Sequence, residues 1–129
     1  MSNVPDQLQY TTDHEFVKAT DTAGEVLIGI TDYAQGELGD IVFVNLPKVG
    51  ESYVTGGVFG TIEAVKAVSD LYSPLAGEIV AVNPALDADP AVVNRDPYGE
   101  GWMIRLKLSD PAARQGLMDA AAYRSHIGA

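Results

Sequence analysis

One lysine of this sequence stands out as a candidate for covalent chemistry. Lys66 lies in a run of small apolar residues, 64–68, that offers its side chain neither a charged partner nor a bulky neighbour. A surface lysine usually lies among polar residues, because its ammonium group needs water while its hydrocarbon stem covers apolar surface. The pattern suits an amine displayed for modification, since acylation removes the charge and requires access by another enzyme. Taken alone, however, the pattern is more typical of an ordinary solvated loop lysine.

The other reactive residue types form no recognisable catalytic constellation. The two histidines, His14 and His126, lie too far apart in the sequence for a metal-ligand spacing, and we expect both to be surface or capping groups. The sequence has no cysteine, which excludes disulfides, thiol catalysis and cysteine-bound metals. The glycine-rich segment 56–60 is not followed by the helix pattern of a phosphate-binding loop, and it predicts strand bending instead. We therefore expect neither a metal site nor self-contained catalysis.

The charge balance narrows the possible partners. The 129 residues include 8 basic and 18 acidic side chains, for a net charge of −10. Such a surface argues against nucleic acid and against anionic membranes, and no apolar run approaches the ~20 residues of a membrane span. Residues 1–6 lack the features of a signal or transit peptide. We expect one domain in the bacterial cytoplasm, or in the mitochondrial matrix if the chain is a processed organellar form.

Short segments separated by turn residues predict a mainly β fold with small helices. Thr31 is placed to cap a helix over 32–38, and Gly39 is placed to end it. Residues 102–108 alternate, with Trp102 and the even-numbered apolar positions on one face and Met103 on the other. Strands are expected over 15–20, 25–30, 40–46, 57–62, 71–73, 78–82 and 101–108. Residues 83–96 are expected to form an ordered loop with a helical turn near 85. Two C-terminal helices are expected, one after a Ser109 cap and one over 120–127.

Four blocks of this sequence occur in a characteristic order. They are residues 14–17 (HEFV), 28–35 with 38–44 (IGITDYAQ and LGDIVFV), 63–67 with 69–74 and 76–79 (EAVKA, SDLYSP and AGEI), and 97–104 (PYGEGWMI). Together these blocks resemble the glycine cleavage system H protein family, and the resemblance covers roughly residues 10–123. Three positions depart from the family pattern: Phe16 stands where tryptophan is frequent, Ala64 where serine is common, and Gly36 is unusual inside the short helix.

The resemblance implies a lipoyl carrier. The implied fold is a barrel-sandwich hybrid of the lipoyl/biotinyl hammerhead type, with lipoate joined through an amide to Lys66. The chain would then be a non-catalytic, monomeric component that serves three enzymes: a pyridoxal-phosphate glycine decarboxylase, a tetrahydrofolate-dependent aminomethyltransferase and a flavin dihydrolipoyl dehydrogenase. A lipoate ligase or a lipoyl/octanoyl transferase would load the arm, and Glu63, Val65 and Ala67 are the candidates for its recognition.

The resemblance also implies that the loaded arm folds back into a surface cleft near Glu15 and Asp70. A carboxylate there would favour a docked cationic amine, although both residues are equally compatible with solvated surface charges. Two other functions remain open, a lipoyl donor to other enzymes and an interaction module that has lost its modification. A biotin carrier is disfavoured, because its lysine usually lies between two methionines, whereas Val65 and Ala67 flank Lys66 here.

Overall fold

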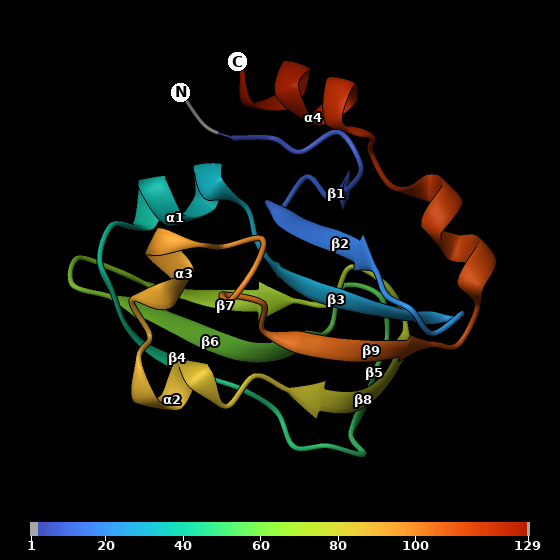
Figure 1. The fold of residues 1–129 in the computed structure, drawn as a ribbon, viewed down its shortest axis with the longest axis horizontal. Helices are drawn as coiled ribbons and strands as arrows, with labels where there is room; N and C mark the ends of the chain where they lie inside the picture. Colours follow the sequence, from blue (N-terminus) through green and yellow to red (C-terminus); the bar gives the residue numbers. More distant parts are fainter. Residues whose placement is uncertain (1–2, 129) are drawn as a thin grey trace.

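Alternating and β-branched segments build two antiparallel sheets in residues 3–128, which the computed structural model describes (Figure 1). The larger sheet has the order β1-β2-β3-β9-β8-β5 and the smaller has the order β4-β6-β7. The strands of the larger sheet are β1 (Gln9–Tyr10), β2 (Glu15–Ala19), β3 (Glu25–Ile30), β9 (Ile104–Leu108), β8 (Gly77–Val82) and β5 (Ser52–Tyr53). Those of the smaller sheet are β4 (Ile41–Asn45), β6 (Val58–Ala64) and β7 (Val68–Tyr72).

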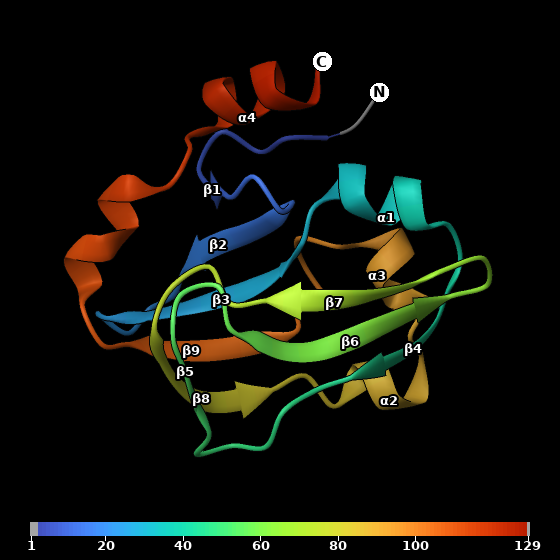
Figure 2. The ribbon, with the colours of Figure 1, turned by 180° about the vertical axis from the view of Figure 1, so that it is seen from behind.

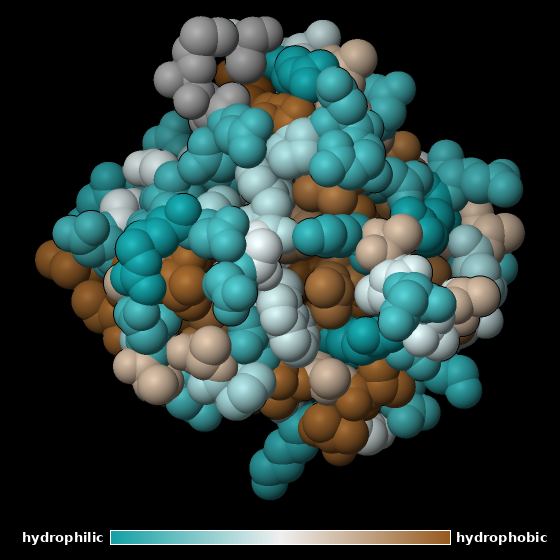
Figure 3. Space-filling view, viewed as in Figure 1, coloured by the Kyte–Doolittle hydropathy of each residue, from teal (hydrophilic) through white to brown (hydrophobic). Residues whose placement is uncertain are grey.

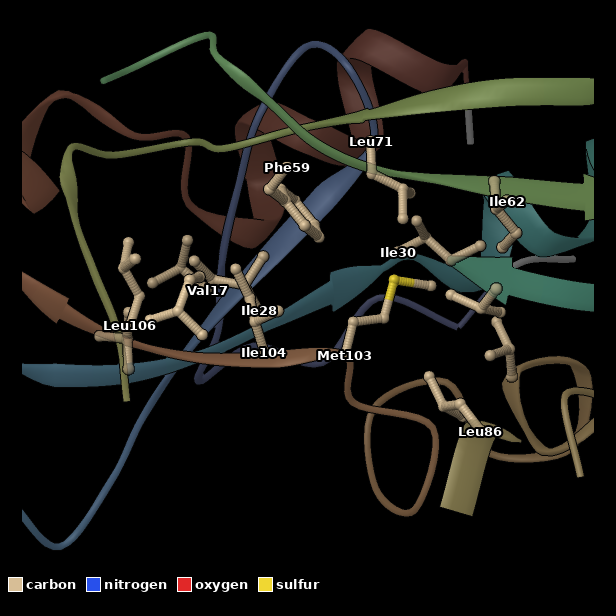
Figure 4. Close-up of a cluster of buried hydrophobic side chains, with 14 of the residues drawn as sticks. Val17, Ile28, Ile30, Phe59, Ile62, Leu71, Leu86, Met103, Ile104 and Leu106 are labelled. Atoms are coloured by element: carbon tan, nitrogen blue, oxygen red, sulfur yellow. The ribbon is translucent and has the colours of Figure 1, made fainter. Parts of the chain in front are cut away.

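The two sheets pack face to face around the main hydrophobic core. Figure 4 shows side chains of both sheets meeting between them, including Ile28 and Ile104 from the larger sheet and Ile62 and Leu71 from the smaller. Each of these four is at most 2% exposed. The arrangement confirms the expected mainly β, two-sheet fold with short helices.

Short helices close the ends of the sheets and connect them. They are α1 (Asp32–Leu38), α2 (Ala85–Ala88), α3 (Val92–Arg95), the 3-10 helix η1 (Pro111–Gly116) and α4 (Ala120–Ile127). The Thr31 side chain accepts the N–H of Ala34 at 3.1 Å and Gly39 ends α1 with a φ of 82°, as the sequence predicts. In residues 3–128, none of these helices has the length and apolar character needed to cross a bilayer.

Several boundaries differ from the sequence predictions. Strand β6 continues to Ala64, and strand β7 already begins at Val68. The region between the two predicted strands, which was expected to be a wide loop around Lys66, is therefore mostly paired strand. Residues 83–96 hold two helices, α2 and α3, rather than one turn. The strands β1 and β5, each of two residues, carry too little pattern to predict.

The C-terminal part holds two further corrections. Asp110, and not Ser109, caps η1, because its carboxylate accepts the N–H of Ala112 at 3.1 Å. Met103 was expected on the polar face with Arg105, yet it is fully buried in the main core. The strand β9 begins only at Ile104, so the regular alternation does not extend to Trp102 and Met103.

Candidate functional site

Lys66 lies at the end of the β6–β7 hairpin, which projects beyond the sheets (Figure 2). The N–H of Ala64 donates to the carbonyl of Ala67 at 2.7 Å, so Val65 and Lys66 form the turn between the two strands. Long strand pairing below the turn holds it rigidly, while Val65 and Lys66 themselves are exposed. The sequence therefore places an amine on a stiff support in open solvent.

The segment after α1 holds the hairpin end from below. The N–H of Val65 donates to the carbonyl of Asp40 at 3.0 Å, which links the turn to the main body. Gly39 lies under the lysine stem: a Cβ there would be 3.5 Å from Cε of Lys66. That distance is an ordinary contact, but Gly39 has a φ of 82°, so any side chain at this position would strain the backbone.

Asn94 of α3 fixes this supporting segment. Its amide nitrogen donates to the carbonyl of Gly39 at 2.9 Å and to Oε1 of Gln35 at 3.0 Å, while its amide oxygen accepts the N–H of Ile41 at 2.9 Å. One side chain from the long connection between β8 and β9 thus satisfies the backbone on both sides of Asp40. The position of Lys66 is therefore set partly by a residue 28 positions later in the chain.

The Lys66 amine is available for reaction. The ion pairs within residues 3–128 are formed by Arg95, Arg105 and Arg124, and none includes Lys66. An exposed primary amine at the end of a rigid hairpin can form an amide with an activated carboxylic acid and can then carry the acyl chain away from the domain. A carboxylic acid cofactor of this kind, lipoate included, fits this position without steric conflict with a bulky neighbour.

A cavity of about 290 Å³ lies beside the hairpin, between α1, β7 and the start of β2. Its lining includes Glu15 from β2, Tyr33 and Glu37 from α1, and Asp70 from β7, with Ile30 among the apolar lining residues. The two carboxylates that the sequence singled out, Glu15 and Asp70, therefore line one cavity although 55 positions separate them. Lys66 is not part of the lining, and it lies four residues from Asp70, a separation of at most about 13 Å along the chain.

Glu15 is the buried acid of this cavity, with only 3% of its surface exposed. Its Oε1 accepts the Thr11 hydroxyl at 2.8 Å, and the Tyr72 backbone N–H also donates to the carboxyl group. Burial, with a smaller contribution from the nearby Asp13, raises the pKa of Glu15 to about 7 even though the two hydrogen bonds act to lower it. Asp70 is exposed by contrast. The cavity thus combines a buried acid that titrates near neutrality with a solvated carboxylate at its edge.

His14 is a residue of this cavity whose role the sequence does not predict. It has a positive φ of 69°, and its Nδ1 lies 2.9 Å from the hydroxyl of Tyr123. Its ring is 4.9 Å from the ring of Tyr33 and 5.5 Å from that of His126, measured between centroids. Burial and the neighbouring His126 lower the pKa of His14. The structure therefore brings the two histidines together, whereas the sequence indicated unrelated groups.

The three candidates for enzyme recognition lie at the hairpin end around Lys66, and their role in recognition stays a prediction. Val65 and Ala67 are exposed beside it in the turn. Glu63 lies in β6, where its register partners are Phe43 of β4 and Val68 of β7. All three residues therefore belong to the same end of the hairpin as the lysine.

Two facing sheets with one lysine displayed at a hairpin end define a carrier domain of the lipoyl/biotinyl type. Comparisons with known proteins specify the family. The model of the glycine cleavage H-protein family matches residues 8–128. The glycine cleavage system H protein of Chlorobium limicola is 55% identical, over 98% of each chain, and that of Bacteroides thetaiotaomicron is 52% identical, over 97% of this chain and 98% of the relative.

A solved structure agrees with the sequence relatives. The crystal structure of a glycine cleavage system H protein from Mycobacterium marinum superposes with a TM-score of 0.88 at 40% identity, and it covers 98% of this chain and 100% of that one. The chain belongs to the glycine cleavage H-protein family.

Proposed function

We propose that this chain is the lipoyl carrier of a glycine cleavage system and that Lys66 carries the lipoyl group through an amide. The observation that supports this most directly is the display of Lys66 at the end of a rigid hairpin, in a chain of this family. In the attachment step, the neutral amine of Lys66 bonds to the carbonyl carbon of an activated lipoyl or octanoyl donor. The leaving group of the donor departs, and the amine releases a proton to solvent. When bound, lipoate would supply a disulfide whose S–S bond opens as one sulfur takes an aminomethyl group; the dithiol left after that group is passed on would be reoxidised to the disulfide by the flavin dehydrogenase.

The protein's own contribution is tethering and shelter. The hairpin holds the attachment point at a defined place, which raises the effective concentration of the arm at a docked partner. The cavity beside α1 is the proposed resting place of the loaded arm. There, the carboxylates of Glu15 and Asp70 would favour a cationic amine, and the apolar lining would exclude the water that hydrolyses it.

The proposed partners are the three enzymes of glycine cleavage and the enzyme that attaches lipoate. They are a pyridoxal-phosphate glycine decarboxylase, a tetrahydrofolate-dependent aminomethyltransferase, a flavin dihydrolipoyl dehydrogenase, and a lipoate ligase or lipoyl/octanoyl transferase. The partner enzymes and their cofactors carry out the bond-making and bond-breaking steps, and the chain acts as a non-catalytic carrier. Its net charge of −10 would steer it toward basic docking surfaces and make docking sensitive to salt.

Intact-mass measurement after incubation with a lipoate ligase, ATP and lipoate tests the proposal. The wild-type protein should gain the mass of one lipoyl group, and Lys66→Arg should gain none while its thermal unfolding is unchanged. Lys48→Arg is the matched control, because Lys48 is also exposed but lies far along the chain, and it should be loaded like the wild type. A lipoyl mass on Lys66→Arg would overturn the assignment.

A further inference from the structure

The outer face of the β4-β6-β7 sheet carries exposed apolar side chains next to Lys66. Val42, Phe43, Val65 and Val68 are 54%, 47%, 75% and 66% exposed. Together with Glu63 they are called here the outer patch. This sheet faces the viewer in Figure 2; Figure 3 views the molecule from the opposite side and shows only the left edge of this region, where the hairpin ends and apolar residues are visible. Exposed apolar residues that gather at one place mark interaction surfaces more often than scattered ones do.

A β-bulge exposes two of the four apolar residues of the outer patch. Ile41 pairs with Ala64 and Phe43 pairs with Glu63, so Val42 is an extra residue in β4. As a result Val42 and Phe43 are both exposed, whereas Ile41 and Val44 on either side of them are buried. Exposing two neighbouring apolar side chains contributes little to the stability of the fold. A bulge that exposes them therefore indicates that they contact another protein.

Register places the rest of the outer patch beside the bulge. Phe43, Glu63 and Val68 are direct neighbours across the three strands, with side chains roughly 5 Å apart from strand to strand. Val65 continues the apolar surface into the turn that holds Lys66. The result is one carboxylate surrounded by apolar side chains, immediately below the reactive amine.

We propose that the outer patch is the docking surface of the enzyme that acylates Lys66, an inference that rests on the proposed function. An unmodified lysine amine lies only about 6 Å from its Cα, so the enzyme that forms the amide must bring its active site onto the hairpin end itself. Enzymes that use the finished arm are reached by its far end, so the surfaces on which they dock need not include the hairpin end. The outer patch is the exposed apolar surface next to that hairpin end.

The side chains of the outer patch indicate which side chains the docking surface of this enzyme should carry. An apolar centre would cover Phe43 and Val68, and a lysine or arginine would face Glu63. The exposed Asp40 and Asp70 and the overall charge of −10 extend the negative rim around the patch. Apolar contact would supply most of the affinity, and the charges would set orientation and the rate of encounter.

Initial rates of loading by a purified lipoate ligase, with ATP and lipoate, test the inference. Phe43→Ser and Val68→Thr should each raise KM for the carrier about tenfold with kcat little changed, because a buried interface anchor contributes to binding. Val49→Ser and Val54→Ser are matched controls, since these valines are 61% and 71% exposed and lie outside the patch; they should load like the wild type. Thermal unfolding shows whether each variant is folded, and Val68→Thr keeps the side-chain shape.

A second measurement addresses the charge. Glu63→Gln should weaken the salt dependence of KM, because it removes the central negative group of the patch.

Wild-type protein that is never loaded at Lys66 would contradict the proposed function. Wild-type protein that is loaded, together with patch variants that load at the same rate, would overturn the docking surface alone. Patch variants that load normally but are slow with glycine decarboxylase would also overturn it, since the patch would then serve another partner.

Discussion

The hydroxyl of Thr11 donates to Oε1 of Glu15 at 2.8 Å and accepts the N–H of the same Glu15 at 3.2 Å. This exchange ties the turn before β2 to a carboxyl group that is buried under the cavity beside the lysine hairpin. A buried acid with so few donors keeps its proton to higher pH than a solvated one. The consequences reach both the stability of the domain and the chemistry of the cavity.

Glu15 should make the domain less stable as the pH rises toward neutrality. In the folded protein burial raises the pKa of Glu15 from 4.5 to about 7, so between these pH values the folded state binds more protons than the unfolded chain. The free energy of unfolding therefore falls from about pH 4.5 to 7, by an amount on the order of 3 kcal/mol, and stays lower above that range. Glu15→Gln removes this titration and should be more stable than the wild type at pH 8 but not near pH 5.

Urea unfolding at pH 5 and pH 8 measures this effect. Glu78→Gln is a suitable control because Glu78 is exposed, and it should leave the pH profile of the wild type unchanged. Parallel profiles for the wild type and Glu15→Gln would contradict the burial argument.

The same carboxyl group should protect the loaded arm. Glu15→Ala is expected to be lipoylated normally but to release ammonia faster from the free, amine-loaded protein, because a docked cation loses its buried partner. In the wild type, protection should strengthen as the pH rises through about 7, where Glu15 becomes ionised. Ammonia release by the isolated loaded protein measures both effects. Equal release rates in the two proteins would rule out a role for Glu15 in docking.

Gly36 should be a site where substitution stabilises the domain. It lies inside α1, it is exposed, and a Cβ added there meets nothing within 4 Å. Gly36→Ala should therefore raise the free energy of unfolding by about 0.5–1 kcal/mol, since alanine has the higher helix propensity and restricts the unfolded chain. Chemical denaturation checks this, with Gly39→Ala as the contrast: Gly39 has a φ of 82°, and its substitution should destabilise. A loss of stability in Gly36→Ala would mean that α1 is strained in a way its open surroundings do not reveal.

Tyr123 should anchor the C-terminal helix to the site. Its hydroxyl lies 2.7 Å from Oγ1 of Thr31 and 2.9 Å from Nδ1 of His14, in a fully buried position. Tyr123→Phe should lower the free energy of unfolding by about 1–3 kcal/mol, because it leaves buried polar atoms without a partner. Tyr33→Phe removes a hydroxyl from the half-buried tyrosine on α1 and should change stability by less than about 0.5 kcal/mol. Equal effects of the two substitutions in urea unfolding would contradict the anchoring role.

Features that depend on neighbours in the sequence were predictable. Thr31 and Gly39 bound α1 because a cap acts within about four residues. The long apolar segments became β3, β4 and β8, and residues 120–127 became α4. Lys66 was identified by its small neighbours and by the blocks around it. The hairpin strands predicted from the sequence were too short, because the polar Ser69 and Asp70 are typical of a loop when their pairing with β6 is not known.

The sequence by itself determined the family, the candidate lysine and most of the strands, since these are written in contiguous residues. Only the tertiary structure decided the burial of Glu15, the cavity it shares with Asp70, the contact of His14 with Tyr123, and the bulge that exposes Val42 and Phe43. Each of these depends on segments that are distant in the chain or on a shift in strand register. The physical reason is that desolvation and cross-strand register arise from packing between elements, which local spacing does not encode.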